Sequence, residues 1–204
     1  MTANSPIRFH SRILVIGGGD GGSAVAKMLK SFGEIPLHEI RILEPSHSYT
    51  YQSLQTCVGG GILPLWMISF PNKFIIPSGV VTTHCRVTEL RPELNEVVAD
   101  DGNIYSYDVL VVASGLVIRT DLVKGLDEAL ANPNVPVGTN YIARFSEKFS
   151  RLREEFKGGR AIFTNPALAI KCGGAPQKIM YLSSDFWNKR KITYSVDFYS
   201  GLGV

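Results

Sequence analysis

The sequence has few cysteines, no long hydrophobic run and no marked excess of either charge. Its three cysteines, Cys57, Cys85 and Cys172, are widely spaced, with no C-x-x-C pair. This argues against a disulfide framework and a zinc site. No apolar run approaches the roughly 18 residues of a membrane-spanning helix. With 21 basic and 18 acidic side chains and no basic stripe, the chain gives no support to nucleic-acid binding.

The four histidines also lack metal-ligand spacing, so no metal site is predicted, and His47 is expected to be solvated. The leader up to Arg12 has two Arg, one His and no acid. It lacks the apolar core of a secretory signal and is too short to identify as a transit peptide. The sequence therefore contains no clear targeting peptide, and its free thiols favour a reducing compartment.

The strongest local pattern covers residues 13–22, read as I-L-V-I-G-G-G-D-G-G. Its apolar run is typical of a strand buried on both faces, and residues 23–30 have helical spacing. Gly17, Gly19 and Gly22 fit G-x-G-x-x-G. In that motif the first Gly permits a tight turn, the second lets a pyrophosphate approach the backbone, and the third allows close packing of helix on strand.

The amides of Asp20 and Gly21, at the start of this helix, would then face the phosphates. A second predicted strand over residues 39–43 ends in Glu44. A carboxylate at this distance past the loop can accept hydrogen bonds from both ribose hydroxyls. A free hydroxyl pair means no 2′-phosphate, so FAD or NAD fits and NADP does not. The competing interpretation is a Gly-rich turn beside a surface Glu.

Residues 80–107 read as four short strands, which predicts an antiparallel meander with segments at 80–85, 86–90, 96–99 and 104–107. Another buried strand follows over residues 108–115 and ends in Ala113-Ser114-Gly115. A meander followed by a buried strand that ends in small residues is typical of FAD-binding domains in oxidoreductases with two nucleotide domains. There the chain passes close to the flavin nucleotide at a residue without room for a side chain, here Gly115, so FAD is favoured over NAD.

We predict an α/β fold with a Rossmann-like FAD-binding domain over residues 10–120, a linker over 121–139 and the start of a second Rossmann-like domain over 140–204. The second domain is expected to contain helices over 141–156 and 177–188 and strands over 160–164 and 192–199. Because nothing follows the last strand, we expect a truncated flavoprotein with two dinucleotide-binding domains. The alternative is a compact two-lobed domain that ends here.

The second domain has no G-x-G-x-x-G of its own, and residues 164–176 take the place of that loop. Cys172 lies there, beside Lys171 and just before a helix opened by Pro176. Both the helix dipole and the cation favour the thiolate, the reactive form of cysteine. We therefore predict a redox function for Cys172. The competing interpretation is a buried structural cysteine.

The other two cysteines are weaker candidates. Cys57 lies where some flavin disulfide reductases carry a flavin-facing cysteine, and Cys85 is expected to be core packing. The glycines of residues 58–62 either let the backbone approach a flat group closely or simply form a turn. Residues 63–77 are apolar and broken by Pro, which predicts a covering loop.

These residues resemble the sulfide:quinone oxidoreductases, specifically the group that includes the mitochondrial enzyme. The resemblance covers nearly all of the chain from Arg12 on and roughly the first half of the family's length. It is carried by V-I-G-G-G-D-G-G, by L-E-P-S followed by Y-Q, and by I-P-S-G-V with R-V-T-E-L. Its most specific part is K-C-G-G-A-P-Q-K-I-M-Y-L-S around Cys172.

The resemblance implies an FAD enzyme that oxidises hydrogen sulfide to a cysteine persulfide and passes two electrons through the flavin to ubiquinone. The sulfur then goes to a small acceptor such as glutathione or sulfite. Cys172 aligns with the first redox cysteine, the one that takes up or relays sulfur. Gln52 and the backbone of Val87 align with further FAD contacts. The implied location is the surface of the mitochondrial inner membrane.

The chain departs from the family over residues 51–61, where Pro and Trp of Y-Q-P-x-W-T-L-V-G-A-G are lost and Cys57 is gained. The second redox cysteine, a later G-D motif and the quinone-binding and membrane-docking segments are expected beyond Val204. Two alternatives stay open. One is a non-catalytic flavin-binding or interaction product, and the other is an NADH-dependent flavin reductase, against which the missing second Gly loop argues.

Overall fold

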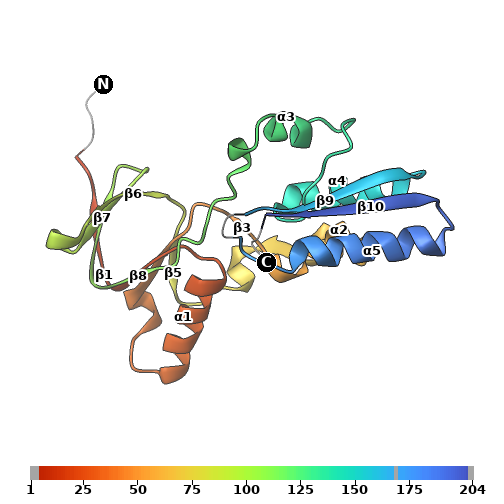
Figure 1. The fold of residues 1–204 in the computed structure, drawn as a ribbon. Helices are drawn as coiled ribbons and strands as arrows, with labels where there is room; N and C mark the ends of the chain where they lie inside the picture. Colours follow the sequence, from red (N-terminus) through yellow and green to blue (C-terminus); the bar gives the residue numbers. More distant parts are fainter. Residues whose placement is uncertain (1–4, 168–169, 202–204) are drawn as a thin grey trace. The chain divides into compact units, whose positions relative to one another are not determined.

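The computed structural model describes residues 5–167 and 170–201, and it divides into two compact units. Unit 1 combines Met1–Tyr49 with Ser69–Val117, and unit 2 combines Thr50–Ile68 with Ile118–Val204 (Figure 1). Residues 1–4 of the leader, residues 168–169 of the loop before Cys172 and residues 202–204 lie outside the described residues.

Unit 1 is built on a six-stranded mixed sheet with the strand order β5-β2-β1-β8-β7-β6. Strands β5, β2, β1 and β8 run parallel, and β7 and β6 continue the sheet antiparallel. Helix α1, Asp20–Phe32, connects β1 to β2. The strands are β1 (Arg8–Ile16), β2 (Ile40–Leu43), β5 (Val81–Thr83), β6 (Val87–Arg91), β7 (Glu96–Ala99) and β8 (Ile104–Val112).

Two sequence predictions for this sheet are wrong. Residues 80–85 do not belong to the antiparallel meander, because β5 pairs in parallel with β2, Arg41 opposite Val81. Residues 104–107 and 108–112 are not separate strands but the single strand β8, which pairs with β1 from Arg8↔Ile104 to Ile16↔Val112. Alternation within a short segment predicts a strand but says nothing of its partner. The true meander is therefore β6-β7-β8.

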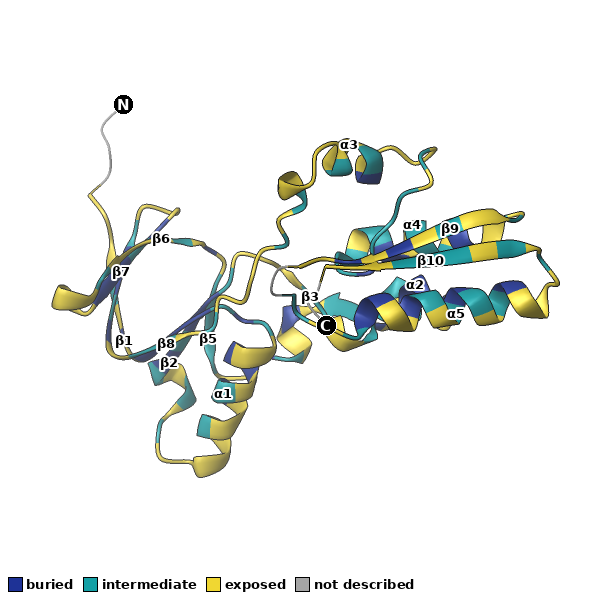
Figure 2. Ribbon diagram, viewed as in Figure 1, coloured by how far each residue is buried: buried dark blue, intermediate teal, exposed yellow. Residues whose placement is uncertain are grey.

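The apolar run of β1 explains why both faces of the sheet are buried at its centre. Leu14 and Ile16 contribute to a core on one face, and Ile13 and Val15 to a core on the other (Figure 2). The side chains alternate because successive residues of a strand point to opposite faces. The prediction of a doubly buried strand is confirmed. The sheet is not fully buried at β8, where Val109 is 52% exposed.

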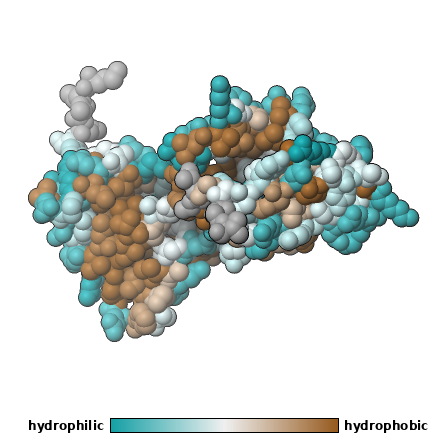
Figure 3. Space-filling model, in the orientation of Figure 1, coloured by the Kyte–Doolittle hydropathy of each residue, from teal (hydrophilic) through white to brown (hydrophobic). Residues whose placement is uncertain are grey.

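A second, two-stranded sheet pairs β3 (Ser48–Thr50) with β4 (Ser69–Pro71). The segment between them contains α2, Gln55–Gly59, and short 3-10 helices. Residues 63–77, expected as a covering loop, contain β4 and the 3-10 helices Leu65–Met67 and Asn72–Phe74. Hydrophobic residues gather on the surface of unit 1 (Figure 3). No helix within the described ranges is both long and apolar enough to cross a membrane.

Unit 2 contains a βαβ unit in which α5 joins two parallel strands, β9 and β10. Its core is formed by Phe163, Ile179 and Trp187, with further aromatic rings packed around them. The two helices and two strands predicted for this region are confirmed, with boundaries that differ by one or two residues. They are α4 (Ala143–Glu155), β9 (Gly159–Asn165), α5 (Ala175–Lys189) and β10 (Tyr194–Ser200). A further helix, α3 (Leu126–Ala131), precedes them and was not predicted.

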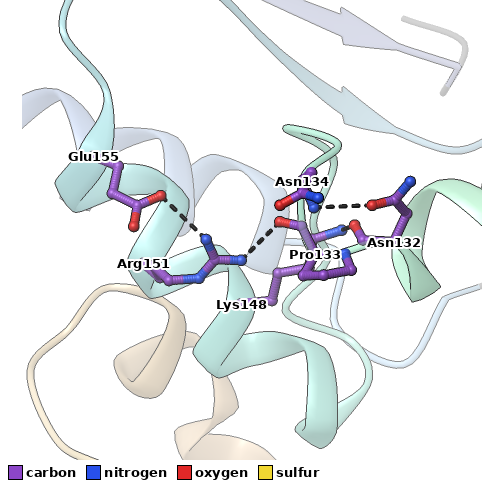
Figure 4. Close-up of polar contacts among 6 residues, drawn as sticks. All are labelled: Asn132, Pro133, Asn134, Lys148, Arg151 and Glu155. Atoms are coloured by element: carbon purple, nitrogen blue, oxygen red, sulfur yellow. Dashed lines mark hydrogen bonds and ion pairs between the residues drawn. The ribbon is translucent and has the colours of Figure 1, made fainter.

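Residues 121–139, expected as a linker, contain α3 and are fastened to α4 by two basic side chains (Figure 4). The ammonium of Lys148 donates to the carbonyls of Ala129 and Asn132 at 2.7 Å and of Leu130 at 3.2 Å. Arg151 donates to the carbonyl of Pro133 at 2.8 Å. Because a helix leaves its last carbonyls without intrahelical partners, Lys148 acts as the C-terminal cap of α3.

Lys148→Met should therefore loosen α3 without unfolding unit 2. The variant leaves three carbonyls without their ammonium, and we expect the local free energy of opening to fall by about 2 kcal/mol. Hydrogen exchange of the amides of residues 126–134 would measure the change. Lys157→Met, at an exposed position after α4, is the matched control. Equal exchange in the two variants would contradict the capping role.

Candidate functional site

The glycine loop between β1 and α1 has two positions that cannot carry a side chain. A Cβ at Gly17, whose φ is +97°, would lie 2.3 Å from the carbonyl oxygen of Ala113 in the segment after β8. A Cβ at Gly22 would lie 1.9 Å from the carbonyl oxygen of Gly17. A Cβ at Gly19, in contrast, would meet nothing within 4 Å. The first and third glycines thus serve the fold, and the second borders open space.

The first turn of α1 starts directly at this open space. Gly19 is its N-cap residue and makes no side-chain cap hydrogen bond. Asp20 and Gly21 are the first residues of the helix, whose first amides have no intrahelical acceptor. Such amides, at the positive end of the helix dipole, are suited to an anion. The loop can therefore accommodate a phosphate beside Gly19.

Glu44, directly after β2, is bound to the same loop. One carboxylate oxygen accepts from the amide of Gly18 at 2.7 Å and the other from the amide of Ser46 at 2.7 Å. Each oxygen keeps a second lone pair, which can accept a hydrogen bond from a ligand hydroxyl. The structure thus brings together the acid and the glycine loop that the sequence pattern paired.

Two histidines lie beside this acid. The ring nitrogen Nδ1 of His84 lies 3.1 Å from the carbonyl oxygen of Glu44, and the ring centroid of His47 lies 3.9 Å from that of His84. His47 is exposed, as predicted. Over the described part of the chain, no group of three or more His, Cys, Asp or Glu residues could hold a metal ion.

Val87 and Gly115 also lie in unit 1. Val87 begins β6, where it pairs with Ala99 of β7, and its side chain packs against the buried core. Gly115 follows β8 with a φ of +73°, and a Cβ there would meet nothing within 4 Å. The remaining two candidates, Gln52 and Cys172, belong to unit 2.

Cys172 is exposed and lies two residues before Gly174, the N-cap residue of α5. Its carbonyl oxygen accepts from the hydroxyl of Tyr141 at 2.7 Å and from the amide of Ala175 at 3.1 Å. Its Sγ lies 4.0 Å from the ammonium of Lys178. The carbonyl next to the sulfur is thus held by two donors, and a cation accompanies the sulfur.

The cation at the sulfur differs from the one that the sequence suggested. The ammonium of Lys171 donates instead to Oε1 of Gln52 at 2.9 Å, and burial lowers the pKa of Lys171. Lys178 lies in the first turns of α5, where the helix dipole disfavours a cation unless an anion is near. Tyr141 was also missed, and its pKa is raised to about 12, first by burial and then by Cys172.

The glycines after Cys57 have a structural explanation. A Cβ at Gly60 would lie 2.6 Å from the side chain of Leu182 in α5, and one at Gly61 would lie 2.1 Å from the guanidinium of Arg153 in α4. These glycines therefore approach the helices of their own unit. Cys57 is partly buried on α2, and its candidate role stays untested.

Cys85 is core packing, as predicted. Cys85 is 3% exposed and belongs to the same core cluster as Leu14 and Ile16 of β1. Burial, followed by the negative charge of Asp101, raises its pKa to about 11. This thiol is therefore neutral and inaccessible at physiological pH.

Comparison with known proteins gives relatives for nearly the whole chain, although no family model matches it. The mitochondrial sulfide:quinone oxidoreductase of Mus musculus is 39% identical over 180 residues, which are 88% of this chain and 39% of the relative. That of Dictyostelium discoideum is 41% identical over 187 residues, 89% of this chain and 40% of the relative. The chain thus spans about two fifths of the length of these curated relatives.

Solved structures give the same fold. The sulfide:quinone oxidoreductase of Aquifex aeolicus matches with a TM-score of 0.72 at 20% identity, over 94% of this chain and 43% of that one. The NADH:rubredoxin oxidoreductase of Clostridium acetobutylicum matches with a TM-score of 0.54 at 13% identity, over 95% of this chain and 58% of that one. The predicted α/β fold of flavoproteins with two dinucleotide-binding domains is confirmed.

Proposed function

Because this chain is related to the sulfide:quinone oxidoreductase family over most of its own length, we propose that it carries the FAD-binding loop and the first sulfur-handling cysteine of such an enzyme. The observation that carries the proposal is Cys172, an exposed thiol at the N-terminus of α5 with the Lys178 ammonium 4.0 Å from its sulfur. The loop where a second dinucleotide motif would lie offers this thiol instead.

Unit 1 fits the nucleotide part of FAD. The open space at Gly19 would admit a phosphate to the backbone, and the amides of Asp20 and Gly21 would then face it. Glu44 is held where its carboxylate can accept the ribose hydroxyls. We add to this set Gly17 and Gly22, which shape the loop, and the proposed contacts at Val87 and Gly115. Gln52 belongs to unit 2 and stays a separate proposed FAD contact. When bound, the flavin would accept two electrons from sulfur and pass them to a quinone.

In the proposed reaction, hydrogen sulfide loses two electrons and two protons, and its sulfur remains on cysteine as a persulfide. Ubiquinone takes up the two electrons and two protons and becomes ubiquinol. The part of this chain is to hold sulfur at Cys172, where the ammonium of Lys178, 4.0 Å from Sγ, can accompany the persulfide anion. Tyr141 fixes the backbone beneath the sulfur. Glutathione or sulfite would then remove the sulfane sulfur.

The relatives are named as mitochondrial enzymes, and we extend that location, at the surface of the inner membrane, to this chain. We likewise propose that residues 10–120 are the FAD-binding domain, 121–139 the connection and 140–204 the first part of a second α/β domain. The connection contains helix α3, which Lys148 caps.

The test is to purify the chain with FAD and to add NADH, polysulfide and sulfide with decylubiquinone separately under anaerobic conditions. We expect NADH to leave the visible absorbance of the bound flavin unchanged and polysulfide to add a sulfane sulfur to Cys172. Sulfide with decylubiquinone should give no steady turnover, because Cys172 alone cannot cycle a trisulfide. Bleaching by NADH would identify a flavin reductase, and bound flavin with no sulfur added to Cys172 would identify a non-catalytic flavin-binding product. Either result would overturn the proposal.

A further inference from the structure

One acidic side chain in the glycine loop has no evident task in binding a dinucleotide. Asp20 is the first residue of α1, at the place where phosphates would meet the helix N-terminus. Glu44, the other acid of the loop, has its carboxylate satisfied by two amides and suits a ribose. A carboxylate at Asp20 would instead repel a pyrophosphate, because like charges at short range disfavour binding.

The structure turns this carboxylate toward a tyrosine. The hydroxyl of Tyr49, in β3, donates to Oδ1 of Asp20. Both residues belong to unit 1. A hydrogen bond to a charged acceptor is roughly twice as strong as a neutral one, so it can decide which rotamer the carboxylate adopts.

Tyr49 is held in place independently of α1. Its ring packs against Phe70 of β4 with the centroids 5.3 Å apart. The buried Asn72 holds the segment that precedes Tyr49. Its backbone amide donates to the carbonyl of His47 at 3.1 Å, and its side-chain amide donates to the carbonyl of Ser46 at 2.6 Å. The hydroxyl is thus a fixed donor that meets Asp20 from outside the loop.

We propose that Tyr49 is a positioning residue for the cofactor: its hydroxyl holds the Asp20 carboxylate away from the phosphate site and so allows this loop to bind a doubly charged pyrophosphate. The inference rests on the proposed binding of FAD and deepens it. It predicts that the two side chains are coupled. The hydroxyl matters only while residue 20 carries a negative charge.

A double-mutant cycle tests this coupling. We expect Tyr49→Phe, which keeps the ring against Phe70, to weaken FAD binding about tenfold, because the freed carboxylate can approach the phosphates. Asp20→Asn should bind FAD at least as tightly as the unmodified chain. Tyr49→Phe added to Asp20→Asn should then change the affinity by less than about twofold. Tyr181→Phe, at an exposed tyrosine of α5, is the matched control.

Ligands and salt give a second readout. The loss caused by Tyr49→Phe should be retained for ADP, which carries the pyrophosphate, and should vanish for adenosine, which carries none. It should also shrink as potassium chloride is raised, because salt screens the repulsion. Binding is measured by fluorescence quenching of FAD and by its displacement with ADP or adenosine.

Two results would show that Tyr49 has only a structural role and would overturn the inference. One is the same loss of affinity from Tyr49→Phe whether or not Asp20→Asn is also present, and the other is an equal loss for ADP and adenosine. An unmodified chain that binds neither FAD nor ADP would overturn the proposed function itself. The two failures are therefore distinguishable.

Discussion

Gly22→Ala is expected to destabilise unit 1 by more than about 3 kcal/mol, because overlap with backbone atoms cannot be relieved by moving a side chain. The added methyl carbon would lie 1.9 Å from the carbonyl oxygen of Gly17, which itself is held against the segment after β8. Urea unfolding, combined with hydrogen exchange of β1 and β8, measures the loss and shows that it falls in unit 1.

Gly19→Ala is the matched control, since it adds the same methyl group to the same loop. Its φ of −73° suits alanine, and the methyl would meet nothing within 4 Å. We expect stability to change by less than about 1 kcal/mol and FAD affinity to fall at least about tenfold, because the methyl occupies the approach of the phosphate. Equal stability losses at the two positions, or tight FAD binding by Gly19→Ala, would contradict this division of roles.

Cys172→Ser should abolish sulfur uptake by the chain. When the chain is incubated with polysulfide, the thiolate attacks a sulfane sulfur, a new sulfur–sulfur bond forms on the protein, and the donor leaves as a shorter polysulfide anion with no net oxidation. We expect mass spectrometry to find one added sulfur on the peptide that contains Cys172. Cys85 should stay unmodified because it is 3% exposed and its pKa is about 11.

Two lysines of α5 sharpen this test. Lys178→Met should slow sulfur uptake about tenfold, since the cation that accompanies the sulfur is removed. Lys189→Met removes a charge from the far end of the same helix, where the ammonium pairs with Asp185 at 2.7 Å, and should have no effect. A sulfur added mainly to Cys57 would contradict the proposed role of Cys172, and identical rates in both lysine variants would contradict that of Lys178.

Where the relevant contacts are local, the sequence was sufficient. Residues 13–22 place strand, loop and helix in direct succession, so their spacing alone predicts β1, the tight turn at Gly17 and the start of α1. Glu44 could be paired with the loop because it ends the next strand, which lies beside β1 in the parallel sheet. The position of Cys172 before a helix followed in the same way from Pro176.

Contacts between distant segments were decided only by the tertiary structure. Strand β5 has the alternation of a meander strand, yet its backbone pairs with β2, 40 residues earlier. Sequence proximity favoured Lys171 as the companion of Cys172, but its ammonium is drawn to Gln52, and the turn of α5 brings Lys178 to the sulfur instead. The physical reason is the same in both cases. Spacing along the chain fixes which face a side chain takes, whereas its partner across the fold depends on how separate segments pack.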